Sequence, residues 1–407
     1  MMKADFMEKL LDGVQVEWKA VWEVTTWDKK FNAVDNYKQP KTIKYHHLLA
    51  SEMKSLISDS GTVKLLTTNE TDYWTTEELA GNRMSYTEVV AIPWGGNAIV
   101  QYYKGKFLTG DNRIATSNDN RYLDNKYLYY FLLNNKNILG SFYRGSGIKH
   151  PSMSDILDME IPIPPLRIQT EIVRILDTFT ELTAELTAEL TARKKQYSYY
   201  RDQLLSFEEG EVEWKTLGEV AVKISSGGTP RTGVSEYYDG EIPWLRTQEV
   251  DFGEIWDTGV KITDLGLKNS SAKLIPANCV IVAMYGATVG KIGINKIPLT
   301  TNQACANIQL DDKVADFRYV FHYLTSKYNH IKSLGSGSQT NINAQIVKEY
   351  PIPIPPLAEQ ARIVAILDKF DTLTTSITEG LPHEIELRQK QYEYYRNMLL
   401  SFPKKEA

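Results

Sequence analysis

The stretch that decides the fold covers residues 161–207 and opens with Ile161-Pro162-Ile163-Pro164-Pro165-Leu166. Its prolines exclude helix and favour an extended backbone. Beyond them, apolar residues recur at steps of three and four, which places them in one narrow stripe along a helix, the pattern of a coiled-coil seam. The stripe consists of Ile168, Ile172, Ile175, Phe179, Leu182, Leu186, Leu190, Tyr197, Tyr200, Leu204 and Phe207. At 1.5 Å per residue the helix spans roughly 60 Å, and it needs a partner helix to bury such a stripe.

The same chain contains a second copy of this stretch. Ile352-Pro353-Ile354-Pro355-Pro356-Leu357 repeats the proline segment 191 residues later (352 minus 161). Farther on, residues 388–396 repeat residues 193–201 at an offset of 195 (388 minus 193). The second copy therefore has four extra residues in its middle, where Glu379-Gly380-Leu381-Pro382 predicts a helix break. The first copy stays helical there, because Thr183-Ala184-Glu185-Leu186 repeats at once as Thr187-Ala188-Glu189-Leu190.

Length and composition indicate a soluble protein of two or three domains. The chain has 407 residues, of which 24% are charged and 42% hydrophobic. Its acidic first residues are untypical of a secretory signal, and no apolar run is long enough to span a membrane. The two cysteines, Cys279 and Cys305, have no metal or redox spacing, so we expect a reducing, cytoplasmic location. The net charge of −5 disfavours non-specific coating of nucleic acid but not a locally basic face.

The repeats predict an α+β protein made of two copies of one scaffold. Val16-Glu17-Trp18-Lys19 returns as Val212-Glu213-Trp214-Lys215, just after the first long helix. We therefore predict an N-terminal helix (1–12), a first mixed α+β domain (13–158), a first long helix (159–207), a second mixed α+β domain (208–348) and a second long helix (349–407). Inside the domains, residues 299–303 match residues 108–112, and Gly286 matches Gly95. The loops differ far more than the helices, which indicates two scaffolds with different loop chemistry.

The residues form no recognisable catalytic or metal-binding pattern. The segment from Gly286 to Ile292 resembles a phosphate-binding loop, but its spacing is one residue short and Ile292 replaces the required hydroxyl residue. A strand–turn–strand is the better interpretation. His46 and His47 are adjacent, so their side chains diverge on any regular element. We expect a binding protein without catalytic residues or a metal site.

Polar loops at recurring positions favour nucleic-acid binding, because their side chains donate and accept hydrogen bonds as base edges and phosphates require. For any single residue a solvated loop is the alternative. The candidates in the second domain are Thr229, Arg231, Arg246, Gln248, Tyr285, Thr288, Lys291, Asn302, Gln303, Ser336, Ser338, Gln339 and Asn341. Those in the first domain are Trp94, Asn97, Asn112, Arg113, Arg144 and Lys149. The tyrosine-rich basic segments 194–201 and 390–396 are either a solvated face or a docking surface for a partner subunit.

The sequence resembles the specificity subunit of type I restriction–modification enzymes over essentially its whole length. The resemblance is carried by the paired proline segments, the Gly-Gly-Thr-Pro at 227–230, Ile242-Pro243-Trp244 and Thr301-Asn302-Gln303. The tandem Thr-Ala-Glu-Leu is similar to the central repeats of the type IC branch. The first domain lacks a clear Gly-Gly-Thr-Pro or Ile-Pro-Trp counterpart.

The resemblance implies two target-recognition domains held apart by an antiparallel coiled coil, with pseudo-two-fold symmetry. Each domain would read one half of an asymmetric, split DNA site. The chain itself would be non-catalytic and hold no cofactor. It would bind two modification subunits, which methylate adenine with S-adenosylmethionine, and two restriction subunits, which use ATP and Mg to cleave double-stranded DNA. The rival interpretation is an assembly scaffold that grips proteins and reads no DNA.

The tandem repeat predicts a ruler for the gap between the half-sites. Each Thr-Ala-Glu-Leu adds roughly 6 Å of helix, against 3.4 Å per base pair. Adding or deleting one repeat should therefore change the unread gap by one or two base pairs and leave the half-sites intact. Because phosphate neutralisation dominates affinity, we also expect the isolated acidic chain to bind DNA weakly.

Overall fold

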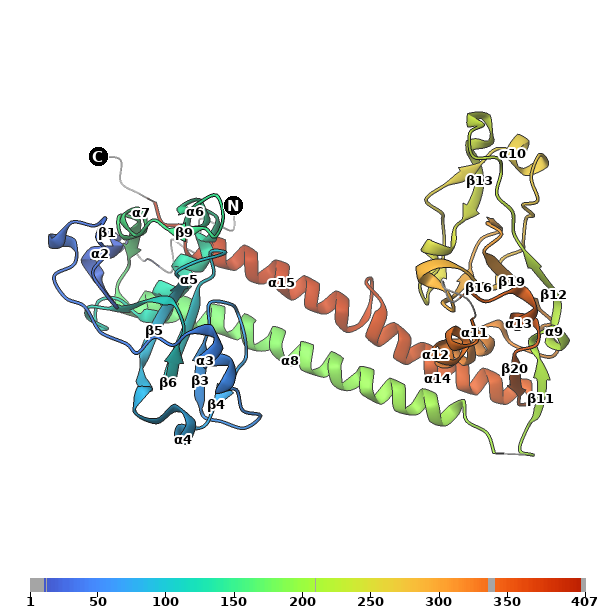
Figure 1. Ribbon diagram of the computed structural model, residues 1–407, viewed down its shortest axis with the longest axis horizontal. Coiled ribbons are helices and arrows are strands. Elements are labelled where there is room, and N and C mark those ends of the chain that lie inside the picture. Colours follow the sequence, from blue (N-terminus) through green and yellow to red (C-terminus); the bar gives the residue numbers. More distant parts are fainter. Residues whose placement is uncertain (1–10, 12, 209, 336–340, 404–407) are drawn as a thin grey trace. The chain divides into compact units, whose positions relative to one another are not determined.

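The computed structural model describes residue 11 and residues 13–208, 210–335 and 341–403 (Figure 1). Apart from Leu11, the predicted N-terminal helix lies outside the described residues. The chain divides into two compact units: unit 1 contains residues 1–185 and 385–407, and unit 2 contains residues 186–384. The boundary falls inside the long helix α8 (Leu166–Leu204), so each unit combines a recognition domain with segments of both spacer helices.

Unit 1 is built on a mixed sheet with the strand order β2-β7-β5-β6-β3-β4. Its strands are β2 (Thr25–Trp27), β3 (Val63–Leu66), β4 (Trp74–Thr75), β5 (Ser85–Pro93), β6 (Gln101–Thr109) and β7 (Asn112–Ser117). A separate hairpin consists of β8 (Tyr143–Arg144) and β9 (His150–Pro151). Its helices are α2 (Val21–Val24), η1 (Asn36–Lys38), α3 (Ala50–Ser55), α4 (Glu77–Ala80), η2 (Gly81–Arg83), α5 (Asn125–Asn134), α6 (Lys136–Ser141) and α7 (Met153–Leu157).

Unit 2 has a sheet with the order β12-β19-β16-β17-β14 and a smaller one with the order β15-β13-β18. The strands are β12 (Ala221–Ser226), β13 (Tyr238–Leu245), β14 (Glu254–Ile255), β15 (Lys261–Ile262), β16 (Val280–Ala283), β17 (Ile292–Asn295), β18 (Thr300–Thr301) and β19 (Cys305–Leu310). The helices are α9 (Leu217–Val220), η3 (Ser235–Tyr237), η4 (Thr247–Glu249), α10 (Asp264–Lys268), η5 (Gly286–Thr288), α11 (Phe317–Ser326), α12 (Tyr328–Ser333) and α13 (Ala344–Lys348).

The two sheets repeat one topology. The order β12-β19-β16-β17-β14 reproduces β2-β7-β5-β6-β3, with antiparallel neighbours throughout except for a parallel last pair in each sheet. The segment from Gly286 to Ile292, which resembles a phosphate-binding loop, begins in η5 and ends at the first residue of β17. Because β16 precedes it and pairs with β17, the strand–turn–strand interpretation is confirmed. The duplication therefore extends through the recognition domains.

Two backbone features recur in the units one residue away from the predicted internal matches. Thr109 lies opposite Leu66 and Thr301 lies opposite Leu245 in parallel pairs, and the next amide nitrogen in each case donates to that leucine's carbonyl. Thr109 and Thr301 thus make the same backbone contact, although their partner strands β3 and β13 hold different places in the two sheets. Similarly, the positive-φ glycine after the central strand is Gly96 in unit 1 (φ +98°) and Gly286 in unit 2 (φ +82°).

Each proline segment is a strand that pairs with the repeated tetrapeptide. In unit 1, β1 (Glu17–Ala20) pairs antiparallel with β10 (Glu160–Ile163); in unit 2, β11 (Glu213–Thr216) pairs with β20 (Pro351–Ile354) in the same register. A buried tyrosine fixes each strand from the main helix of its domain. The hydroxyl of Tyr127 donates to the carbonyl of Pro162, and that of Tyr319 to the carbonyl of Pro353, both over 2.9 Å. The prolines thus cap the recognition domain and direct the chain into the spacer helix.

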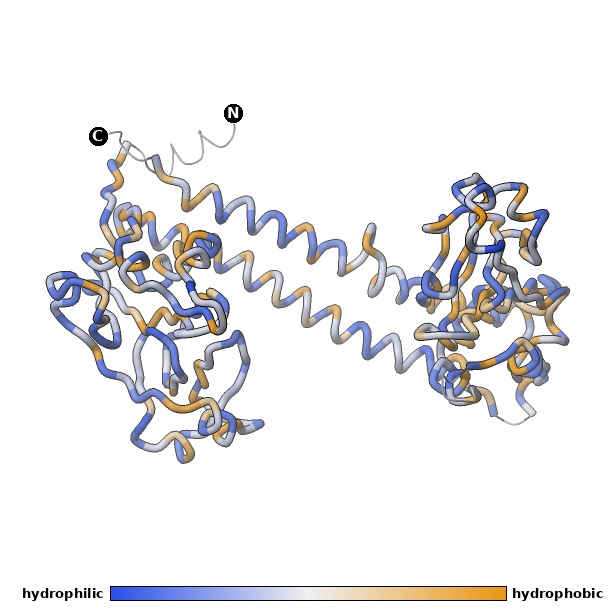
Figure 2. The backbone as a smooth tube through the Cα atoms, turned by 45° about the horizontal axis from the view of Figure 1, so that its top comes forward, coloured by the Kyte–Doolittle hydropathy of each residue, from blue (hydrophilic) through white to orange (hydrophobic). Residues whose placement is uncertain are grey.

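The spacer helices pack in the same way within each unit. The second spacer consists of α14 (Leu357–Thr375) and α15 (Gly380–Leu399). In unit 1 the ring of Phe179 on α8 stacks on Tyr395 of α15, with centroids 5.2 Å apart; in unit 2 the equivalent Phe370 of α14 stacks on Tyr200 of α8 at 5.8 Å. Figure 1 shows that the paired segments run in opposite chain directions in each unit. Figure 2 shows apolar and polar residues alternating along α8, as its stripe predicts.

The stripe is most deeply buried where it meets the recognition domain. Ile168, Ile172 and Leu176 are fully buried in the core of unit 1, and Ile363 and Leu367 occupy the equivalent places in unit 2. In the tandem repeats, Thr183, Leu186 and Leu190 are only half-buried and Thr187 is exposed.

The helix break lies slightly earlier than the sequence predicts. The non-helical residues are 376–379, and α15 begins at Gly380 with φ +76°. A side chain at this glycine would lie 2.5 Å from the carbonyl oxygen of Thr372. Pro382 stays helical because the first turn of a helix needs no amide hydrogen there.

Candidate nucleic-acid interface

In unit 2 the loops that follow β12, β13, β16 and β18 lie together. The hydroxyl of Thr229 donates to the side-chain carbonyl of Gln303, and the hydroxyl of Thr288 donates to the carbonyl of Thr247 over 2.8 Å. The amide nitrogen of Asn302 donates to Leu245 at the end of β13. Asn341 also lies beside these loops, because the amide nitrogen of the next residue donates to Met284, which precedes Tyr285. Most predicted contact residues of the second domain are thus brought to one edge of unit 2, which we call its recognition edge.

Arg246 is held at this edge by an acidic partner, and both of its outer nitrogens lie 3.3 Å from the side-chain amide of Gln248. Its Nε lies 3.3 Å from Oε1 of Glu249, whose Oε2 accepts from the amide nitrogen of Gly259 at 2.7 Å. A cavity of about 630 Å³ lies beside it, lined by Val234, Tyr238 and Trp244 among others. Arg231 is exposed at the turn that leads into this cavity. A guanidinium group beside aromatic side chains can donate two hydrogen bonds to the paired acceptors of a guanine base or to a phosphate.

The glycines of the Gly-Gly-Thr-Pro segment serve packing. A side chain on Gly227 would lie 2.0 Å from the carbonyl oxygen of Thr301, and one on Gly228 would lie 2.3 Å from the amide nitrogen of Ala272. The indole Nε1 of Trp244 donates to the carbonyl of Gly228 over 2.9 Å. The two glycines therefore allow the backbone to pass close to Thr301 and Ala272, and this path places Thr229 at the recognition edge.

The remaining candidates of unit 2 differ in accessibility. Tyr285, Gln248 and Gln303 are exposed, whereas the ammonium group of Lys291 is paired with Asp251 at 2.6 Å. Lys291 is therefore partly neutralised before any DNA binds. Ser336, Ser338 and Gln339 lie outside the described residues.

In unit 1 the loop after β5 and the β8–β9 hairpin form the corresponding edge. The amide nitrogen of Gly96 donates to the carbonyl of Lys149 over 2.9 Å, and Nδ1 of His150 lies 2.7 Å from the carbonyl oxygen of Trp94. Asn97 and Lys149 are exposed, and Trp94 is half-buried. Arg144 is also exposed, but it is paired with Asp155 at 2.7 Å.

Two predicted contact residues of unit 1 are wrong, because they are buried beneath this edge. Asn112 is fully buried, and its side-chain nitrogen donates to the carbonyl of Leu66 over 2.8 Å. Arg113 is 3% exposed; it pairs with Asp28 at 3.2 Å and with Asp111 at 2.7 Å. Both follow a turn in the sequence, where polar residues are normally solvated, but β7 begins at Asn112 and carries them into the core.

Arg113 supports the recognition edge from below. Its guanidinium carbon lies 4.4 Å from the ring centroid of Trp94, a cation–π distance. Asp28, fully buried, also accepts from the amide nitrogen of Ile114 and lies 3.2 Å from Nε2 of His47. The hydrogen bond to Asp28 raises the pKa of His47 against the effect of burial. The sequence pattern excluded His47 as a metal ligand and gave no sign of this network.

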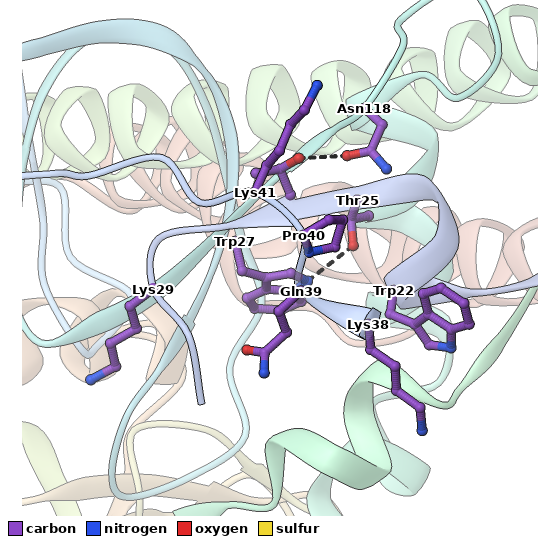
Figure 3. Close-up of a pocket in the computed structure, with 10 residues that line it drawn as sticks. Trp22, Thr25, Trp27, Lys29, Lys38, Gln39, Pro40, Lys41 and Asn118 are labelled. Carbon is purple, nitrogen blue, oxygen red and sulfur yellow. Dashed lines mark hydrogen bonds between the residues drawn. The ribbon is translucent and has the colours of Figure 1, made fainter. Parts of the chain in front are cut away.

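Lys29 is an exposed cation at this edge that sequence reasoning also missed. Its ammonium group lies 5.0 Å from the ring centroid of Trp94. A cavity of about 260 Å³ begins beside it and is lined by Trp22, Lys38 and Lys41 as well. Figure 3 shows the three lysines pointing in different directions, and Lys38 is paired with Asp158 at 2.7 Å. The cavity therefore does not gather positive charge for a single anion.

The described ranges contain no group of three His, Cys, Asp or Glu side chains placed to hold a metal. Nor does any helix within them combine the length and apolarity needed to cross a membrane.

The comparisons with known proteins decide the family. The sequence model described as the type I restriction modification DNA specificity domain matches residues 29–193 and again residues 209–387. The chain belongs to this family. It is 40% identical to the specificity subunit of the EcoR124I/EcoR124II type I restriction enzyme of Escherichia coli, over 100% of this chain and 99% of that protein. It is 33% identical to a putative specificity subunit of Haemophilus influenzae, over 98% of both chains.

A solved S subunit from M. genitalium has the same fold, with a TM-score of 0.62 and 16% identity over 97% of this chain and 98% of that one. The family, the duplicated α+β fold and the role of a DNA specificity subunit, which the sequence predicted, are confirmed. Assignment to the type IC branch stays a prediction.

Proposed function

We propose that each unit reads one half of an asymmetric, split DNA site. The observation that carries this proposal is one scaffold present twice with unlike side chains on the same edge. Unit 1 presents Trp94, Lys29 and Lys149, whereas unit 2 presents Arg246 and Gln303. Because base readout depends on the donors and acceptors that reach the groove, unlike edges read unlike half-sites.

Membership in the type I specificity family supports a proposal for the partners and their chemistry. The chain would be non-catalytic. It would bind two modification subunits, which methylate adenine with S-adenosylmethionine, and two restriction subunits, which use ATP and Mg. The tyrosine-rich basic segments of α8 and α15 would be the docking surfaces for the modification subunits. They are exposed at Tyr199 and Tyr394, which recur at the same place in the two copies.

Methylation by the assembled complex tests the proposal residue by residue. Replacing Arg246 by alanine should cost about 1–3 kcal/mol at one half-site and leave the other half-site unchanged. Arg362→Ala is the matched control, because Arg362 is an exposed arginine of α14 paired with Glu359 at 2.6 Å, away from the recognition edge. Arg246→Ala with unchanged specificity, or selection from random duplexes that yields no common sequence, would favour the assembly scaffold instead.

A further inference from the structure

The two units share one backbone arrangement where the turn before the main helix meets the proline segment. Nε2 of Gln169 donates to the carbonyl of Tyr122 (2.8 Å), and Nε2 of Gln360 donates to the carbonyl of Val314 (3.0 Å). The amide nitrogens of Tyr122 and Val314 each donate over 2.9 Å to the carbonyl three residues earlier. Tyr122 and Val314 therefore occupy equivalent positions, which carry side chains of very different length.

In unit 1 the ring of Tyr122 bridges the turn and strand β1. Its hydroxyl donates to the carboxylate of Glu17, which lies opposite Ile163 in the β1–β10 pair. Burial and the hydrogen bond to Glu17 raise the pKa of Tyr122 to about 12. Tyr122 thus connects the turn to strand β1 through a charged acceptor.

In unit 2 the corresponding place is a cavity. Glu213 lies opposite Ile354, in the register that Glu17 has with Ile163, but Val314 is too short to reach it. A cavity of about 450 Å³ occupies this place, with Val212, Val314, Ile354, Pro355 and Leu357 forming its apolar walls and Glu213 on its lining. Leu357 is 41% exposed. The carboxylate of Glu213 matches the one that accepts from the Tyr122 hydroxyl in unit 1.

We propose that this cavity, formed by unit 2 alone, is a docking pocket for a tyrosine side chain of the modification subunit. The ring would lie against Val314 and Leu357, and its hydroxyl would donate to Glu213 as that of Tyr122 does to Glu17. Tyrosine is suited to such a place because it combines a large apolar ring with one polar end. The pocket lies where the proline segment enters α14, and residues 211–213 of its lining follow the end of α8, one of the helices proposed to dock that partner.

The charges at the rim define the partner further. Lys215 is paired with Glu213 at 3.3 Å, but Lys313, which also lines the cavity, makes no ion pair among the described residues. An acidic residue beside the partner's tyrosine would pair with Lys313. In unit 1 the side chain of Tyr122 occupies the equivalent site. The two units therefore bind the partner through different contacts.

A substitution that fills the pocket tests the proposal. Val314→Tyr places in unit 2 the side chain that unit 1 has, so the full chain should fold and the pocket should close. We expect binding of one modification subunit to weaken by at least ~10-fold, measured by titration calorimetry and native mass spectrometry without DNA. Val314→Ala, which enlarges the pocket without filling it, should bind within about three-fold of the wild type. Unchanged affinity and stoichiometry for Val314→Tyr would overturn the proposal.

A photo-crosslinking residue at Leu357 identifies the occupant in the assembled complex. We expect the crosslink in a modification-subunit peptide that contains a tyrosine next to an acidic residue. A crosslink to a second copy of this chain, or none, would contradict the assignment. The inference rests on the proposed assembly with modification subunits and not on DNA reading. Because the binding measurement contains no DNA, a negative result would count against the docking pocket and not against half-site recognition.

Discussion

Replacing Arg113 by methionine tests the buried network beneath the recognition edge of unit 1. The change removes the guanidinium group but keeps a side chain of similar length. It leaves the fully buried carboxylate of Asp28 with His47 and the amide nitrogen of Ile114 as its partners. Breaking a buried ion pair by removing one partner costs about 3–5 kcal/mol, because the remaining charge is desolvated without compensation.

The expected loss is large enough to measure in the whole chain. For a unit of this size, each kcal/mol shifts the melting temperature by about 2–4 °C, so the transition of unit 1 should move down by about 6–20 °C. Calorimetry resolves it, since unit 2 serves as an internal reference. Trp94 also loses the cation beneath its ring, so methylation specificity should weaken at the half-site read by unit 1.

Two matched variants separate this explanation from a general effect of losing an arginine. Arg144→Met removes the exposed pair with Asp155, whose side chains are 69% and 36% exposed, and should cost less than about 1 kcal/mol. Combining Arg113→Met with Asp28→Asn should recover part of the loss, because no unpaired charge remains. A melting temperature for Arg113→Met within 2 °C of the Arg144→Met value would refute the reasoning.

Three further predictions concern other parts of the chain. The hydrogen bond to Asp28 raises the pKa of His47. The stabilisation from protonated His47 is therefore complete below pH 6.5 and is lost as the pH rises through the raised pKa. His47→Gln should make the melting temperature of unit 1 independent of pH over that interval. Burial raises the pKa of the Cys279 thiol to about 11 and that of Cys305 to about 12, so iodoacetamide at pH 8 should alkylate neither in the native chain but both after unfolding; rapid native labelling would contradict this. Deleting residues 187–190 shortens α8 by roughly 6 Å and should change the unread gap by one or two base pairs, as mapped by methylation; altered half-sites with an unchanged gap would reject the ruler.

The sequence predicts the duplicated framework well, because its signals are local and repeated. The stripe of α8, the proline segments and the four extra residues all follow from periodicity and from the chemistry of proline. The pairing of each proline strand with a repeated tetrapeptide was not predicted, although the two motifs recur together. A contact between residues 146 positions apart (163 minus 17) leaves no local signal, as the pairing of Glu17 with Ile163 shows.

The recognition edges are predicted less well, because burial depends on tertiary packing. Asn112 and Arg113 have the composition of a turn but lie in a strand whose buried partner, Asp28, is 85 residues away from Arg113. Gly227 and Gly228 suggest a flexible loop, yet their role is set by the approach of Thr301 and Ala272. By contrast, Thr229 and Gln303 do lie together at one edge, because each follows a strand end in a Gly- or Asn-containing turn, and their contact with DNA stays a prediction.

The most direct test of two unlike readers in one chain is a map of methylated adenines in DNA from a host that carries this subunit with its modification partners. The account predicts one motif of two different short sequences separated by unread base pairs of fixed number. A continuous motif, two identical halves or a gap of variable length would contradict it.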